Sequence, residues 1–233
     1  MSNNLHNELR KEFQLERLIL FSDAVFAIAI TLLVIEIKIP DKEQLKNLGL
    51  TEVTDQSLLK GLAHLIPKFV GFLITFMLTG LYWIIHHRMF GFVTSYTKKM
   101  LILNLVFLFF IALMPFSTGF YSEYAGPELV REQLKIPMTF YVLNFFCVGF
   151  TNFLMWVYIT NPKNKVAEPL IDPLVAKKAK ARALVVPCIF LLMLLIAYLT
   201  NVLFAVYVPM LIPIVLRIMN KKISKSHSQI SGN

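Results

Sequence analysis

The sequence predicts an all-α membrane protein with six transmembrane helices. Of its 233 residues, 57% are hydrophobic and only 16% are charged, and the mean hydropathy is +0.65. A soluble domain carries about a quarter charged residues, so this composition excludes an ordinary soluble domain and a disordered chain. Six apolar runs account for the excess of hydrophobic residues.

The six runs define the spans and leave no room for a separate soluble domain. A hydrocarbon core of about 30 Å requires about 20 apolar residues per helix. We therefore expect a single transmembrane domain over 15–220, between a cytoplasmic N-terminus (1–14) and a cytoplasmic tail (221–233). In chain order, the spans are expected near residues 15–37, 67–90, 100–120, 137–160, 183–199 and 202–219.

The distribution of basic residues predicts the orientation of the spans. The net charge is +9, from 23 Lys and Arg against 14 Asp and Glu. Most of the basic residues fall before, between or after the spans on one side, which the positive-inside rule assigns to the cytoplasm. Both termini are therefore predicted to be cytoplasmic. Topology explains the positive charge, so no nucleic-acid partner is expected.

No feature of the sequence indicates an enzyme, a metal site or a cofactor. Glycine-rich phosphate loops and nucleophile elbows do not occur. His86 and His87 are adjacent, so on a helix they do not form the i, i+4 pair that binds zinc. Cys147 and Cys188 lie in apolar runs and are interpreted as small buried apolar residues.

Two loops leave alternatives open. Residues 38–66 are amphipathic and are either a short interfacial helix or a solvated loop. Residues 161–182 are expected to be a cytoplasmic connector that ends in a basic run. That run either binds lipid or simply follows from the topology.

The first span contains an acidic residue whose charge is unfavourable inside a membrane. Asp23 lies about one and a half turns inside the apolar run. An ionised carboxylate costs about 2.5–3.5 kcal/mol near the bilayer centre and less near an end, so Asp23 requires a partner. We expect a network with Arg17 and a histidine of the second span, His86 or His87. Trp83, one turn before the histidines, is either an interfacial anchor or a wedge against the first span.

A stripe of mainly apolar residues runs along one face of the first span. At 100° per residue, it comprises Arg17, Phe21, Ala24, Ile28, Thr31 and Ile35. Asp23 points away from this stripe. Taken alone, such a pattern is typical of helix packing more often than of a pore lining.

The first span also carries a distinctive motif. Arg17, Phe21, Ser22 and Asp23 form Arg-x-x-x-Phe-Ser-Asp, followed by Ala-Val-Phe-Ala-Ile-Ala-Ile-Thr-Leu-Leu-Val. This motif resembles the transmembrane protein 175 family of potassium-permeable channels, as does Tyr-Trp-x-x-His-His at the end of the second span. Animal members have two six-helix repeats, so one repeat resembles the prokaryotic type, a homotetramer in the plasma (inner) membrane.

The resemblance implies roles for individual residues. It implies that the first helix of each subunit lines the pore, without a carbonyl selectivity filter, and that K⁺ is the permeant ion. Ile28 falls on the constriction, Thr31 on the selectivity position, and Leu32 and Ile35 on apolar pore positions. The positions assigned to the motif and the packing network are Arg17, Phe21, Ser22, Asp23, Trp83, His86 and His87.

The sequence therefore predicts a potassium-preferring cation channel with a hydrophobic gate, in contact with membrane lipids. The alternative is a proton-coupled secondary transporter that uses Asp23 with His86 and His87 as a relay. The sequence shows no inverted repeat and no broken helix at mid-membrane depth, the features that accompany such transporters.

Overall fold

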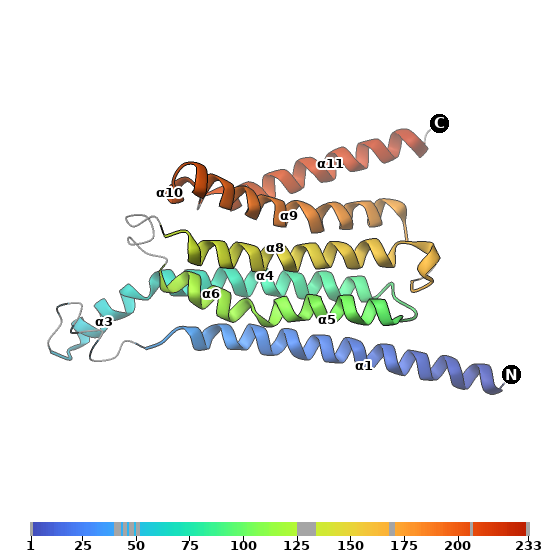
Figure 1. Cartoon of the computed structure of the whole chain (residues 1–233), viewed down its shortest axis with the longest axis horizontal. Coiled ribbons are helices and arrows are strands. Elements are labelled where there is room, and N and C mark those ends of the chain that lie inside the picture. Colours follow the sequence, from blue (N-terminus) through green and yellow to red (C-terminus); the bar gives the residue numbers. More distant parts are fainter. Residues whose placement is uncertain are drawn as a thin grey trace.

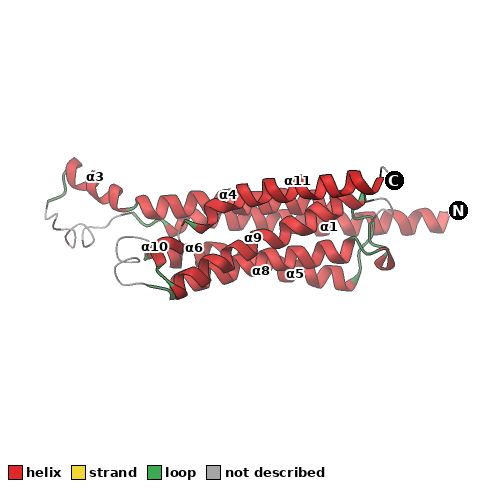
Figure 2. Ribbon diagram, turned by 90° about the horizontal axis from the view of Figure 1, so that it is seen from above, coloured by secondary structure: helices red, strands yellow, loops and turns green. Residues whose placement is uncertain are grey.

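The chain folds as an elongated bundle of helices (Figures 1 and 2). The computed structural model describes residues 2–39, 43, 46, 49, 52–124, 134–167, 171–205 and 207–231. The helices are α1 (Ser2–Leu32), η1 (Leu33–Glu36), α3 (Asp55–His64), α4 (Ile66–Phe90), α5 (Lys98–Ala112), α6 (Met114–Glu123), α8 (Ile136–Ile159), η2 (Pro162–Asn164), α9 (Pro173–Leu199), α10 (Val202–Ala205), η3 (Val208–Leu211) and α11 (Ile212–Ser231).

Six helical segments of the described chain are long and apolar enough to cross a membrane, which confirms the predicted fold class. They are Glu12–Glu36, Ile66–Phe90, Lys98–Glu123, Ile136–Ile159, Pro173–Leu199 and Val202–Lys225. The N- and C-terminal ends lie at the same end of the bundle (Figure 1).

Prolines shape the third and sixth segments. The third segment is divided into α5 and α6 at Leu113, and Pro115 lies in the first turn of α6. The sixth comprises α10, η3 and α11 rather than one continuous helix, and Pro209 and Pro213 lie within it. Proline lacks a backbone donor and fixes its own φ, so it favours the start of a helix over its interior.

The connector before the fifth span is partly helical. α9 begins at Pro173, within the stretch expected to be a loop, because the Asp172 side chain accepts a hydrogen bond from the backbone N–H of Leu174 at 2.7 Å. This N-cap satisfies one of the free donors at the helix start. On the opposite side of the bundle, the amphipathic loop contains α3, which begins with a capping box between Thr54 and Ser57. A helix is therefore present in that loop.

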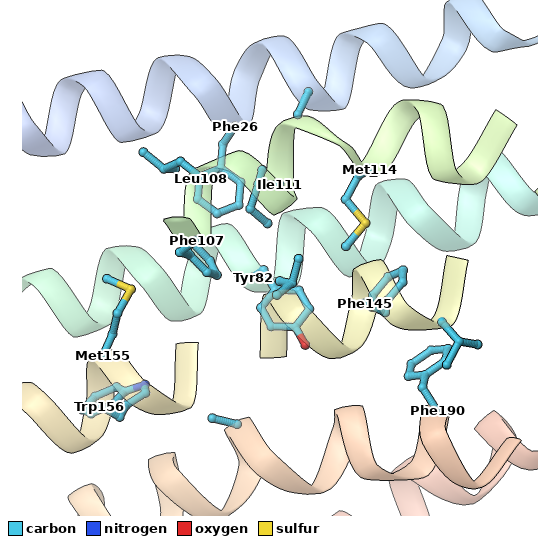
Figure 3. Close-up of a cluster of buried hydrophobic side chains, with 14 of the residues drawn as sticks. Phe26, Tyr82, Phe107, Leu108, Ile111, Met114, Phe145, Met155, Trp156 and Phe190 are labelled. Atoms are coloured by element: carbon cyan, nitrogen blue, oxygen red, sulfur yellow. The ribbon is translucent and has the colours of Figure 1, made fainter. Parts of the chain in front are cut away.

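Aromatic side chains from several helices fill the core (Figure 3). Phe26 of α1 packs on Phe107 of α5 with their ring centroids 5.9 Å apart. Phe145 of α8 stacks on Phe190 of α9 at 4.9 Å. α8 contacts α5, α6 and α9, whereas α1 contacts α4, α5 and α6. α1 is therefore packed on one side only, at the edge of the bundle.

Gly149 permits the close approach of α8 and α9. A Cβ atom at this position would lie 2.6–2.9 Å from three ring atoms of Pro187, and a proline ring cannot rotate away. Gly149→Ala is expected to lower the free energy of unfolding by about 1–3 kcal/mol, as overpacking does. Thermal unfolding in detergent measures this change.

Gly80→Ala is the matched control, because a Cβ on Gly80 of α4 would meet no atom within 4 Å. Alanine in place of a helical glycine is expected to be neutral or stabilising there. Equal loss of stability in both variants would contradict the close-packing argument.

Candidate functional site

One face of α1 is unpacked along its whole membrane-spanning length. Ile28 is 58% exposed and Ile35 is 67% exposed, and Leu32 beside them is 41% exposed. All members of the predicted stripe are exposed: Arg17, Phe21, Ala24, Ile28, Thr31 and Ile35. The opposite face, with Ser22, Phe26, Ala29 and Leu33, is buried against α4, α5 and α6. Within one copy of the chain, the stripe is therefore not a packing surface.

Thr31 provides a hydroxyl group within the apolar part of this face. Its hydroxyl lies 3.0 Å from the carbonyl oxygen of Ala27 and 2.9 Å from that of Ile28. The single hydroxyl proton is donated to the helix backbone, so the oxygen retains lone pairs that face outward. Such an oxygen can accept a hydrogen bond or contact a cation.

Asp23 bonds to Trp83, a member of the network that the resemblance implies, and not to the expected Arg17 or a histidine. Its carboxylate accepts a hydrogen bond from the indole Nε1 of Trp83 at 2.9 Å. The guanidinium of Arg17 lies over the ring of Phe13, 5.9 Å from the centroid. The ring of His87 packs against Trp83 at 5.8 Å. Trp83 thus acts as the wedge between α4 and α1, and Asp23 is bonded to it rather than to Arg17 or a histidine.

His86 belongs to a separate, buried chain of hydrogen bonds. Its Nε2 lies 2.8 Å from Oδ1 of Asn104. The Asn104 amide donates to the Ser22 hydroxyl at 2.9 Å, and Ser22 donates to the carbonyl of Leu18 at 2.8 Å. These hydrogen bonds join α4, α5 and α1 through the side chains of His86, Asn104 and Ser22, which are at most 1% exposed.

Asn104 was not singled out from the sequence, although a signal was available. It is the one amide side chain in the apolar run of the third span. A buried amide at membrane depth needs hydrogen-bond partners. That requirement indicates an interhelical contact, but it does not identify Ser22 and His86 as the partners.

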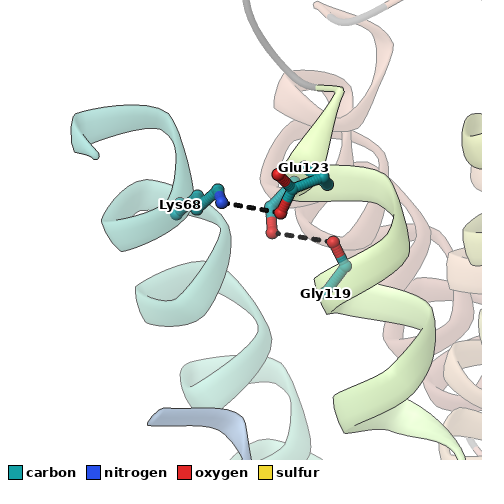
Figure 4. A network of polar contacts seen from close by, with 4 residues as sticks. Lys68, Gly119 and Glu123 are labelled. Atoms are coloured by element: carbon teal, nitrogen blue, oxygen red, sulfur yellow. Dashed lines mark hydrogen bonds and ion pairs between the residues drawn. The ribbon is translucent and has the colours of Figure 1, made fainter. Parts of the chain in front are cut away.

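The far end of the bundle carries its own polar contacts. Lys68 of α4 forms a salt bridge with Glu123 of α6 at 2.6 Å, and the hydroxyl of Ser122 donates to the carbonyl of Gly119 (Figure 4). Glu36, at the end of η1, lies against Gly119. Acidic side chains therefore lie where the exposed face of α1 ends.

The side chains that could bind a metal ion do not form a cluster in the described part of the chain. Among the residues that the structure describes, no three His, Cys, Asp or Glu side chains are placed to hold a metal ion. Cys147 and Cys188 are free thiols. Cys188 is exposed on α9 rather than buried as expected, because it lies on the outward face of that helix, where an apolar run contacts lipid as readily as protein.

Comparisons with known proteins match this chain to ion channels. A family model described as endosomal/lysosomal potassium channel TMEM175 matches residues 17–115. A potassium channel of Chamaesiphon minutus is 29% identical over 161 residues, which cover 69% of this chain and 73% of that protein. A potassium channel of Streptomyces collinus is 26% identical over 162 residues, which cover 70% of this chain and 72% of that protein.

Animal and structural relatives agree with this match. The human endosomal/lysosomal proton channel TMEM175 is 32% identical over 145 residues, which cover 60% of this chain and 27% of that protein. The crystal structure of a lysosomal potassium-selective channel TMEM175 homolog from Chamaesiphon minutus has a TM-score of 0.69 at 24% identity, and the match covers 89% of this chain and 98% of that one. The chain is therefore similar to the TMEM175 family of ion channels, and these matches are to channels rather than to enzymes.

Proposed function

We propose that four copies of this chain form a potassium-preferring cation channel whose pore is lined by α1 of each copy. The observation that carries the proposal is the exposed stripe of α1, which is the helix that bears the family motif. A single copy packs this helix on one side only, and four copies around an axis would cover the other side. The bacterial relatives are named potassium channels, which favours K⁺ as the permeant ion.

The gate in this proposal is a ring of Ile28 side chains. Ile28 and Leu32 of α1 and Ile35 of η1 are exposed on neighbouring turns. Four such sets would make an apolar constriction that stops ions by dewetting. No Thr-Val-Gly-Tyr-Gly segment is present, so the proposed channel works without a carbonyl filter.

Thr31 is the proposed selectivity residue. Because its proton is donated to the Ala27 and Ile28 carbonyls, its lone pairs are free for a partly dehydrated cation. Thr31→Ala is expected to reduce the preference of K⁺ over Na⁺, which a shift in the reversal potential under bi-ionic conditions measures.

Thr151→Ala is the matched control for Thr31→Ala. The hydroxyl of Thr151 makes the same pair of bonds to its own helix, at 2.7 Å to Cys147 and 3.1 Å to Val148, but it lies buried on α8. Its replacement is expected to leave the reversal potential unchanged. An unchanged reversal potential in Thr31→Ala would remove Thr31 from the selectivity site.

A flux assay tests the channel itself. Purified protein in liposomes would be loaded with K⁺, placed in Na⁺, and followed with a pH-sensitive dye with and without a protonophore. Rapid K⁺ efflux that requires only the gradient and the protonophore is expected. Dye signals that appear without the protonophore would indicate proton conduction, the ion named for the animal relatives.

The same assay separates the channel from a proton-coupled transporter. A proton relay would require hydrogen bonds between Asp23 and the histidines. In the structure, Asp23 is instead bonded to Trp83, and His86 is bonded to Asn104. Flux that is seen only with an imposed proton gradient would favour the transporter.

The proposed setting is the plasma membrane of a prokaryote, with both termini in the cytoplasm and lipid around the tetramer. The end of α4 and the starts of α5 and α9 lie at the end of the bundle that holds both termini (Figure 1). Arg88 is in the last turn of α4, Lys98 is the first residue of α5, and the first turns of α9 are basic. The positive-inside rule favours the cytoplasm for that end.

A further inference from the structure

A pocket of about 440 Å³ opens at the end of the bundle where α4 ends and α9 begins. Its walls come from α4, the turn that follows it, α8 and α9. Three basic side chains and two buried polar side chains line it: Arg88, Lys178, Arg182, Asn152 and Trp156. The rest of the lining consists of apolar side chains and one glycine. This pocket lies away from the exposed stripe of α1.

The three basic side chains bring an uncompensated positive charge to the pocket. Lys178 and Arg182 are four residues apart and therefore share one face of α9. Arg88 approaches from the last turn of α4. Within the described part of the chain, none of the three has a carboxylate partner, and Arg182 uses one guanidinium N–H to donate to Asn220 at 3.2 Å. Most of their donors are left for an anion.

Two polar side chains in the pocket wall have no hydrogen-bond partner among the described residues. Both amide atoms of Asn152 and the indole Nε1 of Trp156 are unpaired. Their residues are only 1% and 4% exposed. An unpaired buried polar group costs about 1–3 kcal/mol. Asn152 and Trp156 are also four residues apart on one face of α8, the face that borders the pocket.

We propose that this pocket binds the phosphate headgroup of an anionic phospholipid. The phosphate oxygens would accept from the basic side chains and from Asn152 and Trp156, and the apolar lining would hold the start of an acyl chain. Basic pockets between transmembrane helices on the cytoplasmic side bind such headgroups. A soluble phosphate would leave the apolar part of the wall uncovered, which favours the lipid. This site is independent of the proposed pore.

Lipid binding is tested on the purified full-length protein. Delipidated protein in detergent would be titrated with phosphatidylglycerol and with phosphatidylcholine, and the lipid-bound fraction measured by native mass spectrometry. Phosphatidylglycerol is expected to bind more tightly than phosphatidylcholine. Lys178→Gln is expected to weaken phosphatidylglycerol binding by about fivefold, the effect of one basic residue at an anionic lipid.

Lys177→Gln is the matched control, because Lys177 is the neighbouring residue on α9, carries the same charge and does not line the pocket. The affinity of Lys177→Gln for phosphatidylglycerol is expected to stay within about twofold of that of the parent. Equal losses in both variants would mean general surface attraction and would overturn the proposal. Displacement of the lipid by millimolar inorganic phosphate or glycerol phosphate would assign the pocket to a soluble anion instead and would also overturn it.

Asn152→Leu tests the pocket without a change in charge. The variant removes the amide donor, so weaker binding of phosphatidylglycerol is expected, with an unfolding temperature of the delipidated protein equal to or above that of the parent. Binding equal to the parent in both Asn152→Leu and Lys178→Gln would overturn the proposal. Because the readout is lipid binding and not ion flux, its failure is distinguishable from a failure of the proposed channel function.

Discussion

Ile28→Asn is expected to raise potassium conductance several-fold. Ile28 is 58% exposed on the unpacked face of α1, where four copies around the proposed pore would form an apolar ring. An apolar constriction blocks ions because water leaves it, and four amide groups would keep the constriction wet. Single-channel recording or K⁺ efflux from liposomes measures the increase.

The matched control for Ile28→Asn is Ile102→Asn. Ile102 of α5 is 53% exposed, so the same substitution places the same polar group on an exposed apolar surface of another helix. Its conductance is expected to equal that of the parent. Unchanged conductance in Ile28→Asn, or an equal increase in both variants, would contradict Ile28 as the gate.

The second large effect is expected from Asn104→Leu. The side chain of Asn104 is fully buried and joins His86 to Ser22 across α4, α5 and α1. Leucine has a similar volume but leaves the ring nitrogen of His86 without its partner. Such a group costs about 1–3 kcal/mol, so we expect the free energy of unfolding to fall by about 2 kcal/mol. Thermal unfolding in detergent measures this loss.

Asn152→Leu provides the comparison that isolates the hydrogen bonds. Asn152 is buried to nearly the same extent, at 1% exposed, but neither of its amide atoms has a partner among the described residues. In delipidated protein, the same substitution there is expected to be neutral or stabilising, because it removes an unsatisfied amide. Similar destabilisation at both positions would show that leucine is poorly accommodated in this core, and that the hydrogen bonds of Asn104 are not the cause.

The residue spacing on α1 predicted which side chains share a face, but not what that face contacts. The 3.6-residue period of one helix is local, so the stripe from Arg17 to Ile35 could be drawn from residue spacing alone. The structure leaves that stripe exposed and buries the face with Ser22 and Phe26. The role of the stripe could not be inferred from the spacing, since helix packing and pore lining produce the same spacing. The residue pattern favoured packing, and the family motif favoured a pore.

Contacts between helices were predicted less well. Asp23 was expected to need a partner because a membrane carboxylate is costly, and it has one. That partner is Trp83, 60 residues away in the chain, rather than Arg17 or a histidine. Several polar groups of the second span were possible partners, and only the rotation of α4 against α1 selects among them.

The amino-acid sequence alone was enough to identify the membrane class, the six apolar segments and the stripe on the first span. These depend on composition and on the spacing of residues within single helices, which local physics sets. Three features required the packed bundle: the link from Asn104 to Ser22 and His86, the close contact of Gly149 with Pro187, and the basic pocket between α4, α8 and α9. Each of these depends on the rotation and depth of two or more helices, and packing of the whole bundle sets both.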